Sequence, residues 1–268
     1  MAKTKGTRLF TFGCSLTRYH WPTWADILGQ SFEEFYNWGN RGAGNRQILE
    51  RFSEAVAKNA FLPDDVIIIQ WTDYHRFDYH MWNPEAHETW YPGGGLFSNT
   101  EQDPTKGLVI SKLWNEQSYQ MHSLNFIQAG VALARTTRCR VYMTFAHDLR
   151  PDFNTGEFQG YKKMMQNSFW LPGDMYSWLI VNHDKRLSFQ GADMGNLSDE
   201  PQIDHHPTPI MYYHWLKERI STRLNLQIDK DFATKMQHAL ENTKIYNDIG
   251  ESILNAGYDT NKHYVRGY

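Results

Sequence analysis

A serine follows an apolar stretch near the N-terminus, where a nucleophile could be presented. Residues 13–17 are Gly-Cys-Ser-Leu-Thr, and they come directly after a predicted strand at residues 8–13. Serine attack on an acyl carbon needs a base, a group that orients the base, and donors for the oxyanion. Ser15 could supply the hydroxyl, while Cys14 could act instead if its thiol pKa were lowered. A tight turn that caps the next helix would use the same residues, so this stretch leaves all three interpretations open.

The groups that could activate such a serine lie in the C-terminal half. Asp204 precedes His206 by two residues, and Pro207 leads into a predicted helix at residues 209–224. An aspartate at this spacing can accept a hydrogen bond from the histidine Nδ1–H, which leaves Nε2 for a serine. An Asx-turn before a helix has the same sequence. The pair is a candidate base and orienter because it falls in a loop where we expect the site.

Strand and helix patterns alternate along the chain and predict its architecture. The β-branched run at residues 65–71 is typical of a strand that is covered on both faces. Alternation of this kind predicts a three-layer α/β/α fold with a mainly parallel, flavodoxin-like sheet, whose ligands bind just after the strands. We predict strands at residues 8–13, 35–38, 65–71 and 139–145, and helices at residues 21–31, 46–60 (with Asn45 as N-cap), 108–136 and 209–224.

Two segments interrupt the alternation. Residues 73–105 are rich in aromatic residues, proline and glycine, and predict a long loop or lid. Residues 148–203 predict a second irregular insertion with a short helix near residues 159–166. We therefore expect one α/β domain over residues 1–228. Residues 229–268 would add a polar helix at 229–255 and a mobile tail from Gly257, packed on this domain or extending from it.

Composition limits the partners and the compartment. The 268 residues carry a formal net charge of −3 without a long basic run, which predicts no nucleic-acid partner. No window has the ~18–20 apolar residues of a membrane span, and no apolar segment follows the first residues as in a signal peptide. The two cysteines, Cys14 and Cys139, make no disulfide framework. We expect a cytoplasmic protein by default, with release by lysis or carriage on a virion as alternatives.

Three blocks of the chain, in order, resemble the SGNH, or GDSL-type, hydrolases. The first block, Gly-Asp-Ser-Leu in the family, is Gly-Cys-Ser-Leu here, so Cys14 stands where the family usually has aspartate. The second block, an Asn-x-Gly-x-x-Gly loop that opens a helix, matches residues 37–45. The last block, Asp-x-His followed by proline, matches residues 204–207. The order and spacing hold over residues 8–225.

The resemblance implies a role for each matched residue. Ser15 would be the nucleophile, His206 the base and Asp204 the group that orients the base. The backbone N–H groups of Ser15 and Gly44 would hold the oxyanion. Gly42 is the alternative for the second donor, because the loop can be aligned either way.

At the position of the family's third block, this chain departs from the family's pattern. The family carries Gly-x-Asn-Asp after its third strand, and the asparagine amide helps to hold the oxyanion, whereas this chain has Thr72 and Asp73. The Thr72 hydroxyl, Asn45 or Arg76 could replace the missing donor. Because an ionised carboxylate cannot donate, we expect Thr72 to face Ser15 and Asp73 to turn away and pair with a cation such as Arg76.

The resemblance therefore implies a serine esterase that cleaves a short acyl ester, such as an O-acetyl group on a carbohydrate, without a cofactor. A catalytically silent binding module and a virion or assembly protein with the same fold are the alternatives. The aromatic segment contains His75, His80 and His87, but no helical His-x-x-x-His pattern with carboxylates. We expect no metal site.

Overall fold

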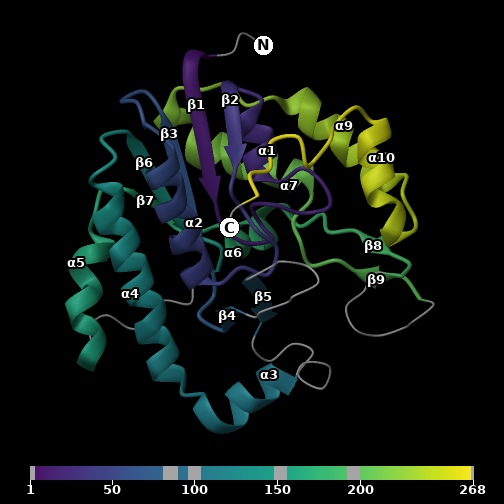
Figure 1. The fold of residues 1–268 in the computed structure, drawn as a ribbon. Coiled ribbons are helices and arrows are strands. Elements are labelled where there is room, and N and C mark those ends of the chain that lie inside the picture. Colours follow the sequence, from purple (N-terminus) through teal and green to yellow (C-terminus); the bar gives the residue numbers. More distant parts are fainter. Residues whose placement is uncertain (1–3, 81–89, 96–103, 148–155, 192–199, 267–268) are drawn as a thin grey trace.

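A five-stranded parallel sheet forms the centre of the computed structural model, which describes residues 4–80, 90–95, 104–147, 156–191 and 200–266 (Figure 1). Its strand order is β2-β1-β3-β6-β7, with every neighbouring pair parallel. This is the order of flavodoxin-like sheets. The predicted α/β/α architecture is confirmed. The strands are β1 (Thr4–Phe12), β2 (Phe32–Asn37), β3 (Val66–Trp71), β6 (Arg140–Phe145) and β7 (Trp170–Asp174).

Helices cover both faces of this sheet (Figure 1). On one face α2 (Asn45–Lys58) packs beside α4 (Glu116–Ala134), and on the other α7 (Pro209–Trp215) packs between α1 (Trp24–Gly29) and α6 (Met175–His183). Because both faces are covered, every residue of β3 is buried. Among the described residues, no helix is long and apolar enough to cross a membrane.

Capping residues determine where several helices begin. α1 begins at Trp24, later than predicted, because Thr23 and Asp26 form a capping box. The predicted helix at residues 108–136 is interrupted: α3 (Pro104–Leu108) and a π-helical turn (Val109–Leu113) precede α4, which Asn115 caps. α7 continues through a second π-helical turn (Leu216–Ile220) into α8 (Ser221–Leu224).

Both predicted insertions contain more regular structure than expected, although the short helix predicted near residues 159–166 is present. Within residues 73–105, β4 and β5 pair as antiparallel strands. Within residues 148–203, β7 is the edge strand of the central sheet and α6 follows it directly. Proline and glycine in β5 and β7 hide the strand pattern, which pairing with neighbours stabilises. The further elements are β4 (Arg76–His80), β5 (Trp90–Gly95), a 3-10 helix (Gly156–Tyr161), α5 (Lys162–Met165), β8 (Ser188–Phe189) and β9 (Gln202–Ile203).

The C-terminal segment also differs from the prediction. In place of one helix it forms α9 (Lys230–Glu241), a 3-10 turn (Tyr246–Asp248) and α10 (Ile249–Asn255). The tail predicted as mobile is held in place, because Tyr264 pairs with Asn37 at the end of β2. α9 and α10 enclose a second apolar cluster that includes Tyr19 and Trp21 from the loop after β1. The C-terminal helices therefore support the loop that carries Ser15.

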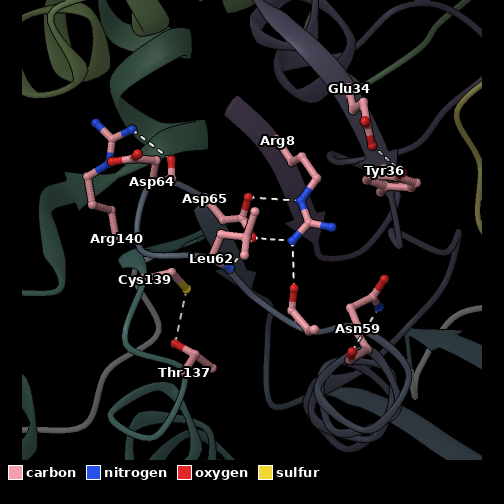
Figure 2. A network of polar contacts seen from close by, with 12 residues as sticks. Arg8, Glu34, Tyr36, Asn59, Leu62, Asp64, Asp65, Thr137, Cys139 and Arg140 are labelled. Atoms are coloured by element: carbon pink, nitrogen blue, oxygen red, sulfur yellow. Dashed lines mark hydrogen bonds and ion pairs between the residues drawn. The ribbon is translucent and has the colours of Figure 1, made fainter. Parts of the chain in front are cut away.

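A buried ion pair fixes the amino end of the sheet (Figure 2). The Nε and Nη2 groups of Arg8 donate to the two carboxylate oxygens of Asp65 at 2.9 and 2.6 Å. Arg140 Nη2 donates to the Asp64 carbonyl at 2.9 Å. The Asp65 side chain is fully buried and that of Arg8 is 21% exposed. This network joins β1 to the starts of β3 and β6 at the end opposite the carboxyl ends of the strands.

Candidate active site

The loop between β1 and α1 separates the two candidate nucleophiles. The N–H groups of Thr17 and Arg18 donate to the Cys14 carbonyl at 2.9 and 3.1 Å and close a tight turn. Cys14 has no exposed surface and packs in the main apolar core. Ser15 is 5% exposed, and its hydroxyl forms no hydrogen bond within the described part of the chain. Of the two residues, Ser15 is the one whose side chain remains available.

Asp204 and His206 form the turn that the sequence predicted. One carboxylate oxygen of Asp204, Oδ1, accepts from both the backbone N–H and the ring Nδ1 of His206, each at 2.8 Å. The Asp204 side chain is 3% exposed and the His206 ring 21%. Since a carboxylate accepts at Nδ1, that nitrogen carries the proton, and Nε2 is left as the basic nitrogen.

Tyr19 links this pair to the Ser15 loop, a role that the sequence analysis missed. Its hydroxyl donates to the second carboxylate oxygen of Asp204 at 2.7 Å, and its ring stacks on His206 with centroids 3.6 Å apart. Trp21, from the same loop, donates through Nε1 to the Pro207 carbonyl at 2.9 Å. The two loops are therefore held side by side. No local pattern marks Tyr19, because its partners lie about 185 residues further along the chain.

Burial favours the neutral form of the His206 ring. Burial lowers the His206 pKa, the Asp204 carboxylate opposes this shift, and the cations Arg76 and Arg41 add to it. Burial also disfavours ionisation of Asp204, but the hydrogen bonds from His206 and Tyr19 keep its pKa below its usual value. At neutral pH the pair is a neutral imidazole beside an ionised carboxylate, the state that a general base requires.

Asp78 accepts a hydrogen bond from the backbone N–H of Gly44, which is one of the predicted oxyanion donors. The Gly44 N–H donates to Asp78 Oδ1 at 2.7 Å, and the Gln47 N–H donates to Oδ2 at 2.9 Å. A Cβ atom on Gly44 would lie 2.6 Å from Asp78 Oδ2. Burial raises the Asp78 pKa to about 6, although these two amides oppose the shift. Asp78 thus caps α2 from β4, which makes Gly44 the N-cap and contradicts the prediction of Asn45 in that place.

Gly42 has a backbone amide that the fold leaves available. Its φ of 74° lies in the left-handed region that favours glycine. Within the described ranges, the backbone N–H groups of Gly42 and Ser15 donate no hydrogen bond. The Gly42 N–H is therefore available to a ligand, whereas the Gly44 N–H is used by Asp78.

Asn45 and Thr72, two candidates for the missing oxyanion donor, differ in whether their side chains are already hydrogen-bonded. Asn45 Oδ1 accepts from the Thr72 N–H at 2.8 Å, and its Nδ2 donates to the Thr72 carbonyl at 2.9 Å and to Ser123 Oγ. Both amide hydrogens of Asn45 are therefore used to fix the backbone after β3. The Thr72 hydroxyl is buried and has no hydrogen-bond partner among the described residues. A buried hydroxyl without a partner is a donor that a ligand could use.

Asp73 does not pair with Arg76 as predicted. Its Oδ1 accepts from the backbone N–H of His75 at 2.7 Å and from the His75 ring Nδ1 at 2.8 Å. The reason is local, because an Asx-turn closes over two residues and leaves the carboxylate occupied. Arg76 instead lies near Asp78, whose pKa its charge lowers.

A cleft of about 240 Å³ lies beside Asn45, between α2, β4 and α4. Arg76 and Asp78 contribute charged groups to its lining, so an apolar wall faces a polar one. Such a cleft could receive one side of an ester. The aromatic part of its lining is Tyr74, Phe77, Tyr119 and Phe126.

One group of side chains in the described ranges could hold a metal ion. His183, His214 and Glu218 place a ligand atom each within 4.8 Å of one another, and the two imidazole rings stack 4.2 Å apart. They come from α6, α7 and the turn after α7, and include none of the predicted site residues. Of the histidines considered above, the His80 side chain and His87 lie outside the described residues.

No family model and no curated protein matches the chain. A crystal structure of a GDSL-like lipase from Bacteroides thetaiotaomicron VPI-5482 is similar to it at 16% sequence identity, over 84% of this chain and 90% of that one, with a TM-score of 0.40. By its own topology, the chain belongs to the class of three-layer α/β proteins with a parallel five-stranded sheet.

Proposed function

We propose that this protein is a serine hydrolase of the SGNH type that cleaves a short-chain acyl ester through an acyl-serine intermediate. The observation that carries the proposal is the Asp204–His206 pair, held by Tyr19 from the same loop as Ser15. A base, its orienter and an available hydroxyl come from two loops that hydrogen bonds join. Three sequence blocks in the family's order support the same assignment.

In this mechanism the Ser15 oxygen attacks the acyl carbon while His206 Nε2 takes its proton. The backbone N–H groups of Ser15 and Gly42 and the Thr72 hydroxyl donate to the oxyanion. When the intermediate collapses, the alcohol leaves with the proton from His206 and the acyl group stays on Ser15. Water then attacks this ester with His206 as base, and the acid is released.

The aromatic lining of the cleft and the resemblance support a choice of substrate class. Flat aromatic rings suit the faces of sugars, which favours an O-acyl carbohydrate. A silent binding module is the second candidate. It is favoured by the absence of a free side-chain amide beside Thr72 in the described residues, since Asn45 uses both of its amide hydrogens.

Labelling with a fluorophosphonate, followed by mass spectrometry of the modified peptide, tests the proposal. The adduct should lie on Ser15 and disappear in Ser15→Ala, together with hydrolysis of 4-nitrophenyl acetate. Cys14→Ala is the matched control and should still be labelled. An adduct on Cys14, or none on the folded protein, would contradict the serine mechanism.

A further inference from the structure

Arg41 holds a positive charge beside the candidate base. It precedes Gly42 in the loop between β2 and α2 and is partly buried. Its guanidinium carbon lies 5.7 Å from the centre of the Tyr19 ring, and that ring stacks directly on His206. The guanidinium and the candidate base therefore both lie near the same aromatic side chain.

This guanidinium is held by a neutral partner. Arg41 Nη1 donates to His20 Nε2 at 2.8 Å, so the imidazole accepts and carries no charge. Burial, with a contribution from Arg41, lowers the His20 pKa to about 4, which keeps the ring neutral at physiological pH. The Arg41 Nε group is buried without a hydrogen-bond partner in the described part of the chain.

No carboxylate neutralises Arg41 among the described residues. The groups that act on its charge are the hydroxyls of Tyr246, Tyr19 and Tyr264, and burial lowers its pKa. A partly desolvated cation without a counterion is costly, and proteins seldom retain one without a ligand. Guanidinium groups bind carboxylates and phosphates through paired hydrogen bonds.

Arg76 is a second cation that acts on the candidate base. It lines the aromatic cleft, and within the described ranges its guanidinium forms no hydrogen bond. Its nearest acidic group, Asp78, is already occupied by the amides of Gly44 and Gln47. Arg41 and Arg76 both act on the charge of His206, so both lie within electrostatic range of the reaction centre.

We propose that Arg41 and Arg76 bind an anionic group of the substrate, so that the preferred ester carries a carboxylate or phosphate close to the scissile bond. This inference rests on the proposed ester hydrolysis and narrows its substrate class. The chain as a whole is acidic, with a formal charge of −3, so the positive character is a local property of the site. A neutral acetyl ester has no charged group for either guanidinium to bind.

Binding to Ser15→Ala protein tests the proposal without turnover. The probes are 4-acetoxybenzoate and its neutral analogue 4-acetoxybenzamide, which place the charge on the alcohol side. A second pair, mono-4-nitrophenyl succinate and 4-nitrophenyl butyrate, places it on the acyl side. In at least one pair the anion should bind about tenfold tighter or better, as one or two charge-assisted hydrogen bonds provide, and this advantage should shrink with added salt.

Substitutions then test which side chains cause the preference for the anion. Arg41→Met and Arg76→Met in the same background should each remove most of the preference for the anion, while Arg41→Lys, which keeps the charge, should retain part of it. Arg46→Met is the control, because Arg46 lines the same cleft but pairs with Glu50 at 3.0 Å. It should leave the preference unchanged.

Two outcomes would overturn the inference: equal affinity for both members of both pairs, or a preference for the anion that survives in both methionine variants. A separate measurement, hydrolysis by the unmodified protein, tests the proposed function. If the unmodified protein hydrolyses none of the four esters, the serine mechanism is wrong even where anion-selective binding remains.

Discussion

Arginine side chains at the two ends of the central sheet differ in whether a carboxylate pairs with them. At the amino end Arg8 forms a bidentate pair with the fully buried carboxylate of Asp65 (Figure 2). At the carboxyl end Arg41 is held by the neutral ring of His20, and no carboxylate among the described residues pairs with it. The arginine at the amino end therefore has a counterion within the fold, whereas the arginine at the carboxyl end has none among the described residues.

The difference separates structural polar groups from functional ones. The charge of a guanidinium that is paired with a fixed carboxylate is already compensated, and removing either partner destabilises the fold. In the segments after β2 and β3, two polar groups remain available: the Thr72 hydroxyl has no partner in the described ranges, and neither has the amide of Gly42. A polar group that the fold leaves without a partner keeps its hydrogen-bonding capacity for a ligand.

The largest expected effect is at the carboxyl end, in Asp204→Asn. The amide removes the charge that stabilises protonated His206 and can hold the wrong tautomer at Nδ1. We expect kcat to fall by about three to four orders of magnitude, with the fold retained. Steady-state kinetics on 4-nitrophenyl acetate and circular dichroism measure the two properties.

Asp73→Asn is the matched control for Asp204. Asp73 makes the same two contacts to His75, at 2.7 and 2.8 Å, in a turn that follows another strand. Because this pair has no assigned part in the chemistry, kcat should change less than about tenfold. Equal losses in the two variants would remove the distinction between a catalytic turn and a structural one.

The next largest effect is expected from Thr72→Val, which keeps the shape and removes the hydroxyl. If this hydroxyl donates to the oxyanion, kcat should fall by about one to three orders of magnitude with little change in KM, because the bond forms mainly in the transition state. Thr144→Val, at a buried threonine in β6, is the control and should leave kcat unchanged. An unchanged kcat in Thr72→Val would exclude Thr72 as a donor.

At the amino end, Asp65→Asn should lower stability and leave the site intact. Breaking a fully buried pair costs about 3–5 kcal/mol, and since Arg8 is partly exposed we expect about 2–3 kcal/mol of unfolding free energy, measured by urea denaturation. Asp184→Asn is the control, because Asp184 and Arg186 form the same bidentate pair in an exposed position. Its cost should stay below about 1 kcal/mol. Equal costs would show that burial does not distinguish the two pairs.

The smallest effect is expected from Tyr19→Phe, which keeps the stacked ring and removes the donor to Asp204. We expect kcat to fall by up to about tenfold, as for the loss of one hydrogen bond to a charged group. In the unmodified protein, activity should rise with pH through a midpoint below about 6.5, because burial and the two arginines lower the His206 pKa. Without the Tyr19 hydroxyl, Asp204 attracts the protonated ring more strongly, so this midpoint should move upward.

Tyr258→Phe is the control for Tyr19, because its hydroxyl donates to buried Asp26 at 2.9 Å, away from His206. It should change stability but neither kcat nor the midpoint of the pH profile. A midpoint that is identical in all three proteins would contradict the role of Tyr19 in positioning the pair.

Sequence alone determined the frame of this molecule. The run from Val66 to Ile69 has no polar face, so it had to be covered on both sides, and these residues have no exposed surface. Because parallel strands end at one edge, the motifs after β1 and β3 were also expected there. Asp204 and His206 formed their turn as predicted, since an Asx-turn depends on neighbouring residues alone.

Only the tertiary structure decided which groups in this frame remain available. Gly42 and Gly44 are equivalent in the sequence, and the choice between them is made by Asp78, which takes the Gly44 amide from a strand 34 residues away. Tyr19 meets Asp204 across 185 residues, and the tail meets β2 across more than 200. A local pattern specifies burial and backbone torsion. Which donor meets which acceptor depends on where distant segments lie after folding, and that decides whether a polar group is structural or free to bind a substrate.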